Sequence, residues 1–203
     1  PTDMRAVVSF WGMFHVTKAV VALALLIGLL LTGHQVWRAY ARVNAPAARA
    51  AIALVGIAGA PIAAFVLLIV MANIQGALAP LSSVMGLLPM DGSVPEVAQV
   101  REQFAAGTIS PVLETLIGDF RVYHLALVVI AAVAAVIVVT ADVVLWTRWS
   151  RMPRQDVRLR RVTATIAAVL PTFAVLLLFI MVVNLSTVAD TAPALAAFFG
   201  GSV

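Results

Sequence analysis

One long apolar segment occurs twice in this sequence. Residues 14–43, FHVTKAVVALALLIGLLLTGHQVWRAYARV, match residues 123–152, YHLALVVIAAVAAVIVVTADVVLWTRWSRM, at a spacing of 109 positions. The rarer residues in the match form four pairs: Phe14 and Tyr123, His15 and His124, Trp37 and Trp146, Arg42 and Arg151. Each segment holds about 25 mainly apolar residues, enough at ~1.5 Å per helical residue to cross a membrane core of roughly 30 Å. The pattern predicts a membrane-spanning helix that has been duplicated.

Composition places most of the chain in lipid. Hydrophobic residues make up 63% of the sequence and charged residues 11%, whereas soluble domains are roughly half apolar and a quarter charged. The apolar segments predict four spans, at about residues 11–36, 50–75, 122–145 and 162–188. We therefore expect an all-α integral membrane protein, built as a bundle of four transmembrane helices. The sequence has no cysteine, which excludes disulfides, thiolate metal sites and cysteine nucleophiles.

The duplication continues into the second and fourth spans. Pro61 matches Pro171 at a spacing of 110. Four further identities share that spacing: Ala64 and Ala174, Leu67 and Leu177, Leu68 and Leu178, Met71 and Met181. We expect two tandem helical hairpins, residues 1–118 and residues 119–203, with the same orientation in the membrane. Because a proline inside a helix removes a backbone hydrogen bond, Pro61 and Pro171 are candidate hinges.

Short helices are predicted outside the four spans. Residues 2–12 predict an interfacial helix that runs into the first span, and the tail from Asp190 predicts another. Ser93 and Glu96 form a candidate capping box for a helix in PEVAQVREQFAAG. Ser110 is the candidate N-cap of a separate short helix, PVLETLIG. We expect these helices to lie at the surface or in the membrane interface.

Arginines gather in the two loops that close the hairpins. Residues 38–49 hold three arginines, and residues 148–161 hold six beside a single aspartate. Because positive residues favour the cytoplasmic side, both loops are predicted to face the cytoplasm of a bacterial cell and both chain ends the outer side of its inner membrane. We expect the second loop to attract anionic lipid headgroups, at about 1 kcal/mol per residue, and not nucleic acid. The six residues are Arg148, Arg151, Arg154, Arg158, Arg160 and Arg161.

Two histidines are the first candidates for chemistry, because polar groups inside a membrane are costly. His15 and His124 occupy matching positions of the two repeats, which predicts one membrane depth for both. Two imidazoles facing each other between helices could act as axial ligands of one b-type haem or another tetrapyrrole. Small residues on the same helices would leave room for the macrocycle: Ala19, Ala22, Ala131 and Ala135. The alternative is that both histidines are interfacial anchors beside aromatic residues.

Other polar residues give further candidates. Asp142 aligns with the residue before His34, so the two side chains are predicted to form either a proton-relay pair or a structural hydrogen bond. Lys18, Asn73 and Asn184 are predicted to make the end of the bundle away from the hairpin loops polar. Lys18 is expected to extend towards the outer membrane surface.

No complete catalytic set can be assembled from the sequence. It contains neither a glycine-rich phosphate loop nor a Ser, His, Asp constellation with useful spacing. The leading prediction is a non-enzymatic membrane subunit that packs in or stabilises a larger complex, with other membrane subunits or further copies of the chain as partners. The alternatives are an electron-transfer subunit that binds haem through His15 and His124, and a small oligomeric proton-coupled transporter or channel.

Overall fold

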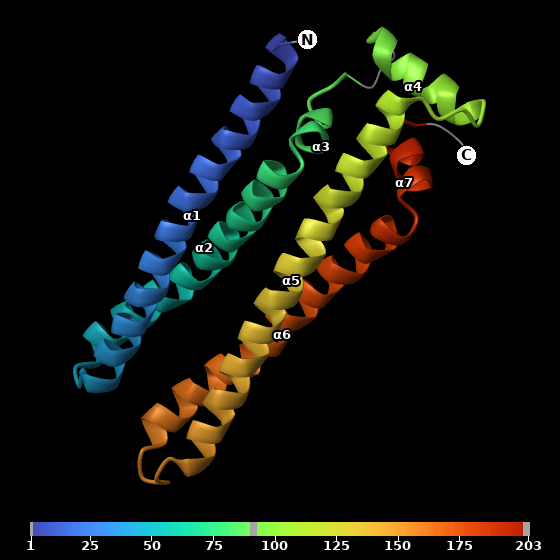
Figure 1. The fold of residues 1–203 in the computed structure, drawn as a ribbon. Coiled ribbons are helices and arrows are strands. Elements are labelled where there is room, and N and C mark those ends of the chain that lie inside the picture. The colour runs from blue at the N-terminus through green and yellow to red at the C-terminus, as the bar shows by residue number, and fades with distance from the viewer. Residues whose placement is uncertain (1, 90–92, 201–203) are drawn as a thin grey trace. The chain divides into compact units, whose positions relative to one another are not determined.

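The fold is all-helical in a computed structural model that describes residues 2–89 and 93–200 (Figure 1). The regular elements in these ranges are α1 (Thr2–Arg42), α2 (Pro46–Leu78), α3 (Pro80–Met85), α4 (Pro95–Ala105), α5 (Pro111–Arg151), α6 (Val157–Ala189) and α7 (Thr191–Phe198). Among them, α1, α2, α5 and α6 are long and apolar enough to cross a membrane. The predicted class, an all-α membrane protein with four spanning helices, is confirmed.

The long helices come in two pairs of equal length. Helices α1 and α5 have 41 residues each, and both bounds of α5 lie 109 positions after those of α1. Helices α2 and α6 have 33 residues each, and the bounds of α6 lie 111 positions after those of α2. The second hairpin loop is therefore two residues longer than the first. These equal lengths support the duplication, which stays a prediction.

The helix bounds give the second pair a different register from the one that the prolines suggest. Helices α2 and α6 continue through Pro61 and Pro171. When the two helices are aligned by their ends, at a spacing of 111, the two prolines are misaligned by one residue. That register aligns Val66 with Leu177, and both are buried. The spacing of 110 predicted from the prolines therefore differs by one residue from the spacing between the ends of α2 and α6. The hinge role of the two prolines stays a prediction.

Residues 2–12 are helical and run into the first span within α1, as predicted. One predicted helix boundary is wrong, because PVLETLIG is the beginning of α5 and not a separate helix. Ser110 caps α5 as expected, since the backbone N–H of Leu113 donates to its hydroxyl over 3.2 Å. The helix then continues through Gly118, because one glycine costs a helix only about 1 kcal/mol and the apolar residues that follow favour its extension.

The predicted capping box at the start of α4 is also wrong. The N-cap residue of α4 is Val94, and no side chain caps this end. Pro95 occupies the first turn, where its missing N–H would have no helical partner in any case. The proline therefore starts α4 without help from a capping side chain.

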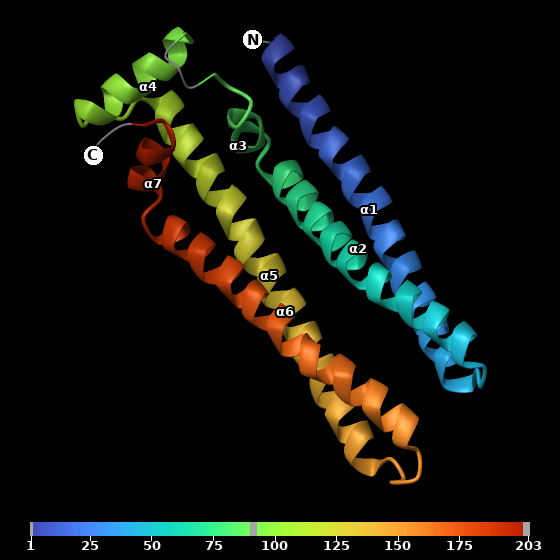
Figure 2. The same cartoon turned by 180° about the vertical axis from the view of Figure 1, so that it is seen from behind.

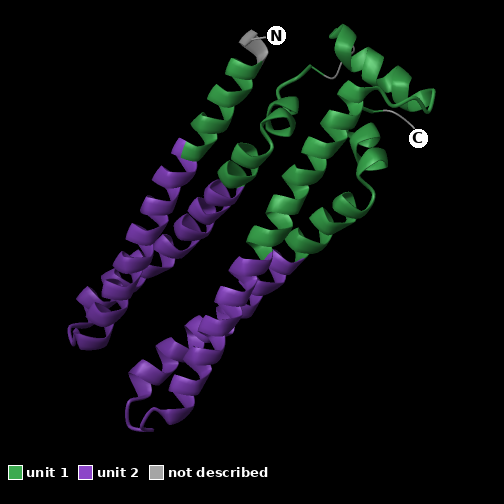
Figure 3. Cartoon of the chain, viewed as in Figure 1, with its two compact units in different colours: residues 1–16, 72–131, 179–203 green, residues 17–71, 132–178 purple. Residues whose placement is uncertain are grey.

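The chain divides into two compact units (Figure 3). One contains residues 1–16, 72–131 and 179–203, and the other contains residues 17–71 and 132–178. We call them the short-helix unit and the loop unit. Each of the four long helices contributes a segment to both units.

The short-helix unit has a hydrophobic core of its own. Helices α4 and α7 lie beside the amino-terminal end of α5 in both views (Figures 1 and 2). The buried residues of this core, the short-helix core, are Met85, Val97, Leu113, Phe120, Leu195 and Phe199. The Arg101 side chain also donates to the Phe199 carbonyl, which ties α4 to the end of α7. The short helices therefore pack around α5. Their position at the surface or in the membrane interface stays a prediction.

In the loop unit, each hairpin has one arginine that hydrogen-bonds backbone carbonyls at its connecting loop. Arg49, the fourth residue of α2, donates to the Asn44 carbonyl over 2.7 Å. Arg160, the fourth residue of α6, donates to the carbonyls of Trp149 and Met152 over 2.9 and 2.7 Å. Both arginines thus bond carbonyl groups at or beside the loop that precedes their own helix. Arg49 and Arg160 are 111 positions apart, in agreement with the register of the helix bounds.

Candidate functional site

Each hairpin contains one histidine bonded to one asparagine. His15 Nδ1 lies 3.0 Å from Asn73 Oδ1, and His124 Nδ1 lies 2.7 Å from Asn184 Oδ1. Both asparagines are buried. The amide nitrogen of Asn184 also donates to the Ile180 carbonyl over 2.7 Å, which fixes the amide so that its oxygen faces the imidazole. Because an amide oxygen only accepts hydrogen bonds, Nδ1 carries the proton and donates it.

Aromatic rings surround both histidines at the same spacing. Four residues before each histidine stands Trp11 or Phe120, with ring centroids 5.2 and 4.5 Å from the imidazole. Directly before each histidine stands Phe14 or Tyr123, at 5.9 and 5.5 Å. All four contacts are edge-on. The residues WGMFH and FRVYH therefore build two copies of one arrangement, which we call the His–Asn sites.

A glycine makes room for the imidazole in the first His–Asn site. A Cβ atom at Gly76 would lie 2.8 Å from both Cε1 and Nδ1 of His15, closer than real Cβ contacts come. The position 111 residues later is Thr187, so the second site is not held in the same way. The first site also connects to α3, since Trp11 Nε1 donates to the Ser83 hydroxyl over 2.7 Å. Phe120 has no such donor and packs in the short-helix core instead.

The second ring nitrogen of each histidine is buried. Among the described residues, neither Nε2 of His15 nor Nε2 of His124 has a hydrogen-bond partner. In a neutral imidazole with its proton on Nδ1, Nε2 carries a lone pair. A histidine that ligates a metal through Nε2 commonly has its other nitrogen fixed by such a bond. Among the described residues, however, no three His, Cys, Asp or Glu side chains gather into a metal site.

The structure pairs each candidate histidine with an asparagine, and the role of His15 and His124 as cofactor ligands stays a prediction. Among the described residues no hydrogen bond joins His15 to His124, and each histidine binds an asparagine of its own hairpin. Ala22, Ala131 and Ala135, which were expected to leave room for a macrocycle, are buried in the helix packing.

The remaining polar candidates are Lys18, His34 and Asp142. Lys18 is exposed, and its extension towards the membrane surface stays a prediction. His34 is exposed, and Asp142 is half-buried with its Oδ1 buried and unpartnered. No hydrogen bond joins His34 to Asp142 in the described part of the chain. Their role as a proton-relay pair stays a prediction.

Asp119 is a polar residue with a role that the sequence did not indicate. Its Oδ2 accepts from both the backbone N–H and the hydroxyl of Ser82, each over 2.7 Å. The bonded amide belongs to the first turn of α3, where backbone donors lack helical partners. Asp119 thus caps α3 from α5. A partner 37 residues distant in sequence leaves no local signal by which to predict it.

The six arginines of the second hairpin loop are not equivalent. Arg148, Arg151, Arg154, Arg158 and Arg161 are exposed, as expected for residues that attract lipid headgroups. Arg160 is half-buried and lies 4.4 Å over the Trp149 ring. Arg160 also donates hydrogen bonds to carbonyls at the end of α5, and these bonds cap that helix and close the loop. Arg160 therefore has a structural role.

Comparisons of the chain with protein-family models, with curated proteins and with solved structures give no match.

Proposed function

We propose that this chain is a non-enzymatic integral membrane subunit that packs in, or stabilises, a larger membrane complex. The observation that carries the proposal is the apolar surface of its spanning helices. In the most apolar window of α1, α2, α5 and α6, only 6%, 6%, 11% and 17% of the residues are buried inside the chain. Large side chains such as Ile57, Phe65 and Phe179 are at least 64% exposed. Most of each span is thus available to lipid or to helices of other subunits.

The polar groups on these helices favour packing over chemistry. The hydroxyls of Thr32, Thr140 and Thr165 donate to carbonyls four residues earlier in their own helices. Such bonds satisfy a hydroxyl internally, so that it can face lipid or another helix without a partner. The His–Asn sites serve as clamps between the two helices of each hairpin. Hydrogen bonds between membrane helices contribute about 0.6 kcal/mol on average, and up to roughly 1.7 kcal/mol.

The arginine-rich hairpin loops support an orientation for this subunit. Because arginines favour the cytoplasmic side, both hairpin loops face the cytoplasm, and both chain ends face the outer side of a bacterial inner membrane. The two hairpins then have equal polarity, as parallel repeats about an axis along the membrane normal would. In this orientation the His–Asn sites lie towards the outer side.

Site-specific cross-linking tests the proposal. A photoreactive phenylalanine analogue in place of Phe65 or Phe179 should form a discrete adduct with a second membrane protein, because both side chains are exposed on spans. The same analogue in place of Phe120, which is 7% exposed, is the matched control and should give no such adduct. Adducts to lipid alone at both exposed positions, with a monodisperse monomer after mild solubilisation, would contradict the proposal.

A second candidate is a tetrapyrrole-binding electron-transfer subunit. It is favoured by the two buried Nε2 atoms, each left as a lone-pair donor by an Nδ1–H that is bonded to an asparagine. His15 and His124 would hold the iron of a b-type haem, and the surrounding alanines would have to separate to admit it. The absorption spectrum of the purified protein decides the matter: a Soret band that is lost in His15→Ala or His124→Ala supports this function, and a colourless protein rejects it.

A further inference from the structure

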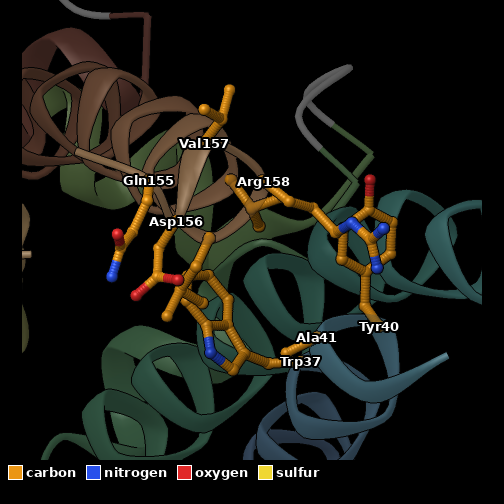
Figure 4. A pocket seen from close by; sticks show the side chains of 9 residues that line it. Trp37, Tyr40, Ala41, Gln155, Asp156, Val157 and Arg158 are labelled. Carbon is orange, nitrogen blue, oxygen red and sulfur yellow. The ribbon is translucent and has the colours of Figure 1, made fainter. Parts of the chain in front are cut away.

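A cavity of about 500 Å³ opens in the loop unit, between the end of α1 and the beginning of α6 (Figure 4). Trp37, Tyr40 and Ala41 line it from α1. Residues 155–159 and Val162 line it from the second hairpin loop and α6. Its size falls within the range of about 300–1,000 Å³ that is usual for small-molecule sites.

The walls of this cavity combine aromatic rings with hydrogen-bonding groups. Trp37 and Tyr40 are half-buried, and each has an apolar ring with one polar atom. From the other side come the amide of Gln155, the carboxylate of Asp156 and the guanidinium of Arg158. A ligand that fits these walls has an apolar portion, a negative group for the arginine, and a hydrogen-bond donor for the amide and carboxylate.

The Arg158 side chain is held loosely at the cavity. One of its terminal nitrogens donates to the Val43 carbonyl over 3.2 Å and lies 3.5 Å from Asn44 Oδ1. Both distances are long for hydrogen bonds of a charged group. A guanidinium has five N–H donors in a planar fork, so these two contacts leave most of its capacity for a phosphate or carboxylate.

The charge around the cavity favours an anion. The two hairpin loops carry arginines at 38, 42, 49, 148, 151, 154, 158, 160 and 161, against the one carboxylate of Asp156. The cavity also lies where an apolar span ends in tryptophan, arginine and tyrosine, residues typical of the membrane interface. At that depth the abundant anions are the phosphates of lipid headgroups.

In the second hairpin, one of the two matching aromatic rings is covered by an arginine of the same hairpin. Trp37 and Tyr40 correspond to Trp146 and Trp149 in the register of α1 and α5. Arg160 lies 4.4 Å over the Trp149 ring and bonds the carbonyls at the end of α5. In the first hairpin, Arg49 bonds the Asn44 carbonyl, and the rings of Trp37 and Tyr40 line the cavity.

We propose that this cavity binds the headgroup of an anionic phospholipid that carries hydroxyl groups, such as a phosphatidylglycerol. Arg158 binds the phosphate with its planar fork. Trp37 and Tyr40 pack against the glycerol and the first methylenes of the lipid. Gln155 and Asp156 accept hydrogen bonds from the headgroup hydroxyls, which gives the carboxylate a function in a strongly positive region.

Native mass spectrometry of the detergent-purified chain, after delipidation and titration with phosphatidylglycerol, tests the proposal. Arg158→Ala should weaken binding at least about tenfold, since a hydrogen-bonded charge is lost. Arg154→Ala and Arg161→Ala remove exposed arginines that do not line the cavity. Each should weaken binding less than Arg158→Ala does, by at most about fivefold, which corresponds to the diffuse attraction of about 1 kcal/mol per surface arginine. Equal losses in all three variants would overturn the site, because they would show diffuse attraction alone. Trp37→Ala, which keeps every charge, should also weaken binding; unchanged binding contradicts the proposal.

Two further titrations identify the source of the ligand. Inorganic phosphate at millimolar concentration should not displace phosphatidylglycerol, and displacement would assign the cavity to a soluble phosphate. Phosphatidylethanolamine should bind more weakly than phosphatidylglycerol. If it binds more tightly and loses that binding in Asp156→Asn, the cavity selects a zwitterionic headgroup and the proposal is wrong. The number of lipids bound to the isolated chain does not depend on a partner subunit. The lipid titrations can therefore fail while the cross-linking experiment succeeds, and the reverse.

Discussion

Replacing Leu113 by alanine should destabilise the short-helix unit by about 2–5 kcal/mol. Leu113 is 1% exposed and lies at the centre of the short-helix core. Removing its side chain leaves a cavity among the packed residues of this core, because the surrounding structure relaxes only partly. We expect α4 and α7 to separate from α5 while the spans remain in the membrane.

Limited proteolysis and thermal unfolding in detergent would measure this effect. The Leu113→Ala variant should be cleaved between α3 and α5 at lower protease concentration and should lose helix content at a lower temperature. The neighbouring Val112 is 80% exposed, which makes Val112→Ala the matched control with little expected effect. Equal resistance of both variants would show that the short-helix core does not hold these helices together.

Replacing Gly76 by alanine should disrupt the first His–Asn site and cost about 1–3 kcal/mol. The new methyl group would lie 2.8 Å from two atoms of the His15 ring. That ring is held by Asn73 and by the rings of Trp11 and Phe14, so it cannot move without loss of contacts. A displaced imidazole also leaves the buried Asn73 amide without this partner.

Gly59 provides the matched control on the same helix. Nothing lies within 4 Å of a Cβ atom at Gly59, so Gly59→Ala should be neutral or should stabilise α2 by up to about 1 kcal/mol. Thermal unfolding in detergent compares the two variants. A double-mutant cycle gives the sharper test, because Gly76→Ala should cost much less in a His15→Ala background. The same cost in both backgrounds would place the strain elsewhere than at the imidazole.

The spans could be predicted from the sequence because their cause is local. Any window of about 20 apolar residues must form a helix if lipid surrounds it, and Ser110 capped its helix as its position indicated. The failures involve competition between segments. The start of α5 depends on how its first turns pack in the short-helix core, where Leu113 and Phe120 meet residues from α3, α4 and α7. No local pattern in PVLETLIG contains that information.

The His–Asn sites could have been predicted in part. The spacing of 110 given by Pro61 and Pro171 aligns Asn73 with Val183, whereas the spacing of 111 aligns it with Asn184. The asparagines would have given a better alignment than the prolines, because polar residues are rare in a span and a buried amide needs a hydrogen-bond partner. The role of Gly76 could not be predicted, because it depends on the position of an imidazole from another helix.

Labelling of single cysteines tests most directly whether two hairpins of equal polarity stand in the membrane. The chain has no cysteine of its own, so Asn44→Cys, Arg154→Cys and Thr108→Cys each introduce one exposed thiol. In intact cells a membrane-impermeant maleimide should label Thr108→Cys alone. In inverted membrane vesicles it should label Asn44→Cys and Arg154→Cys. Labelling of the two hairpin loops from opposite sides of the membrane would contradict the duplicated, parallel arrangement.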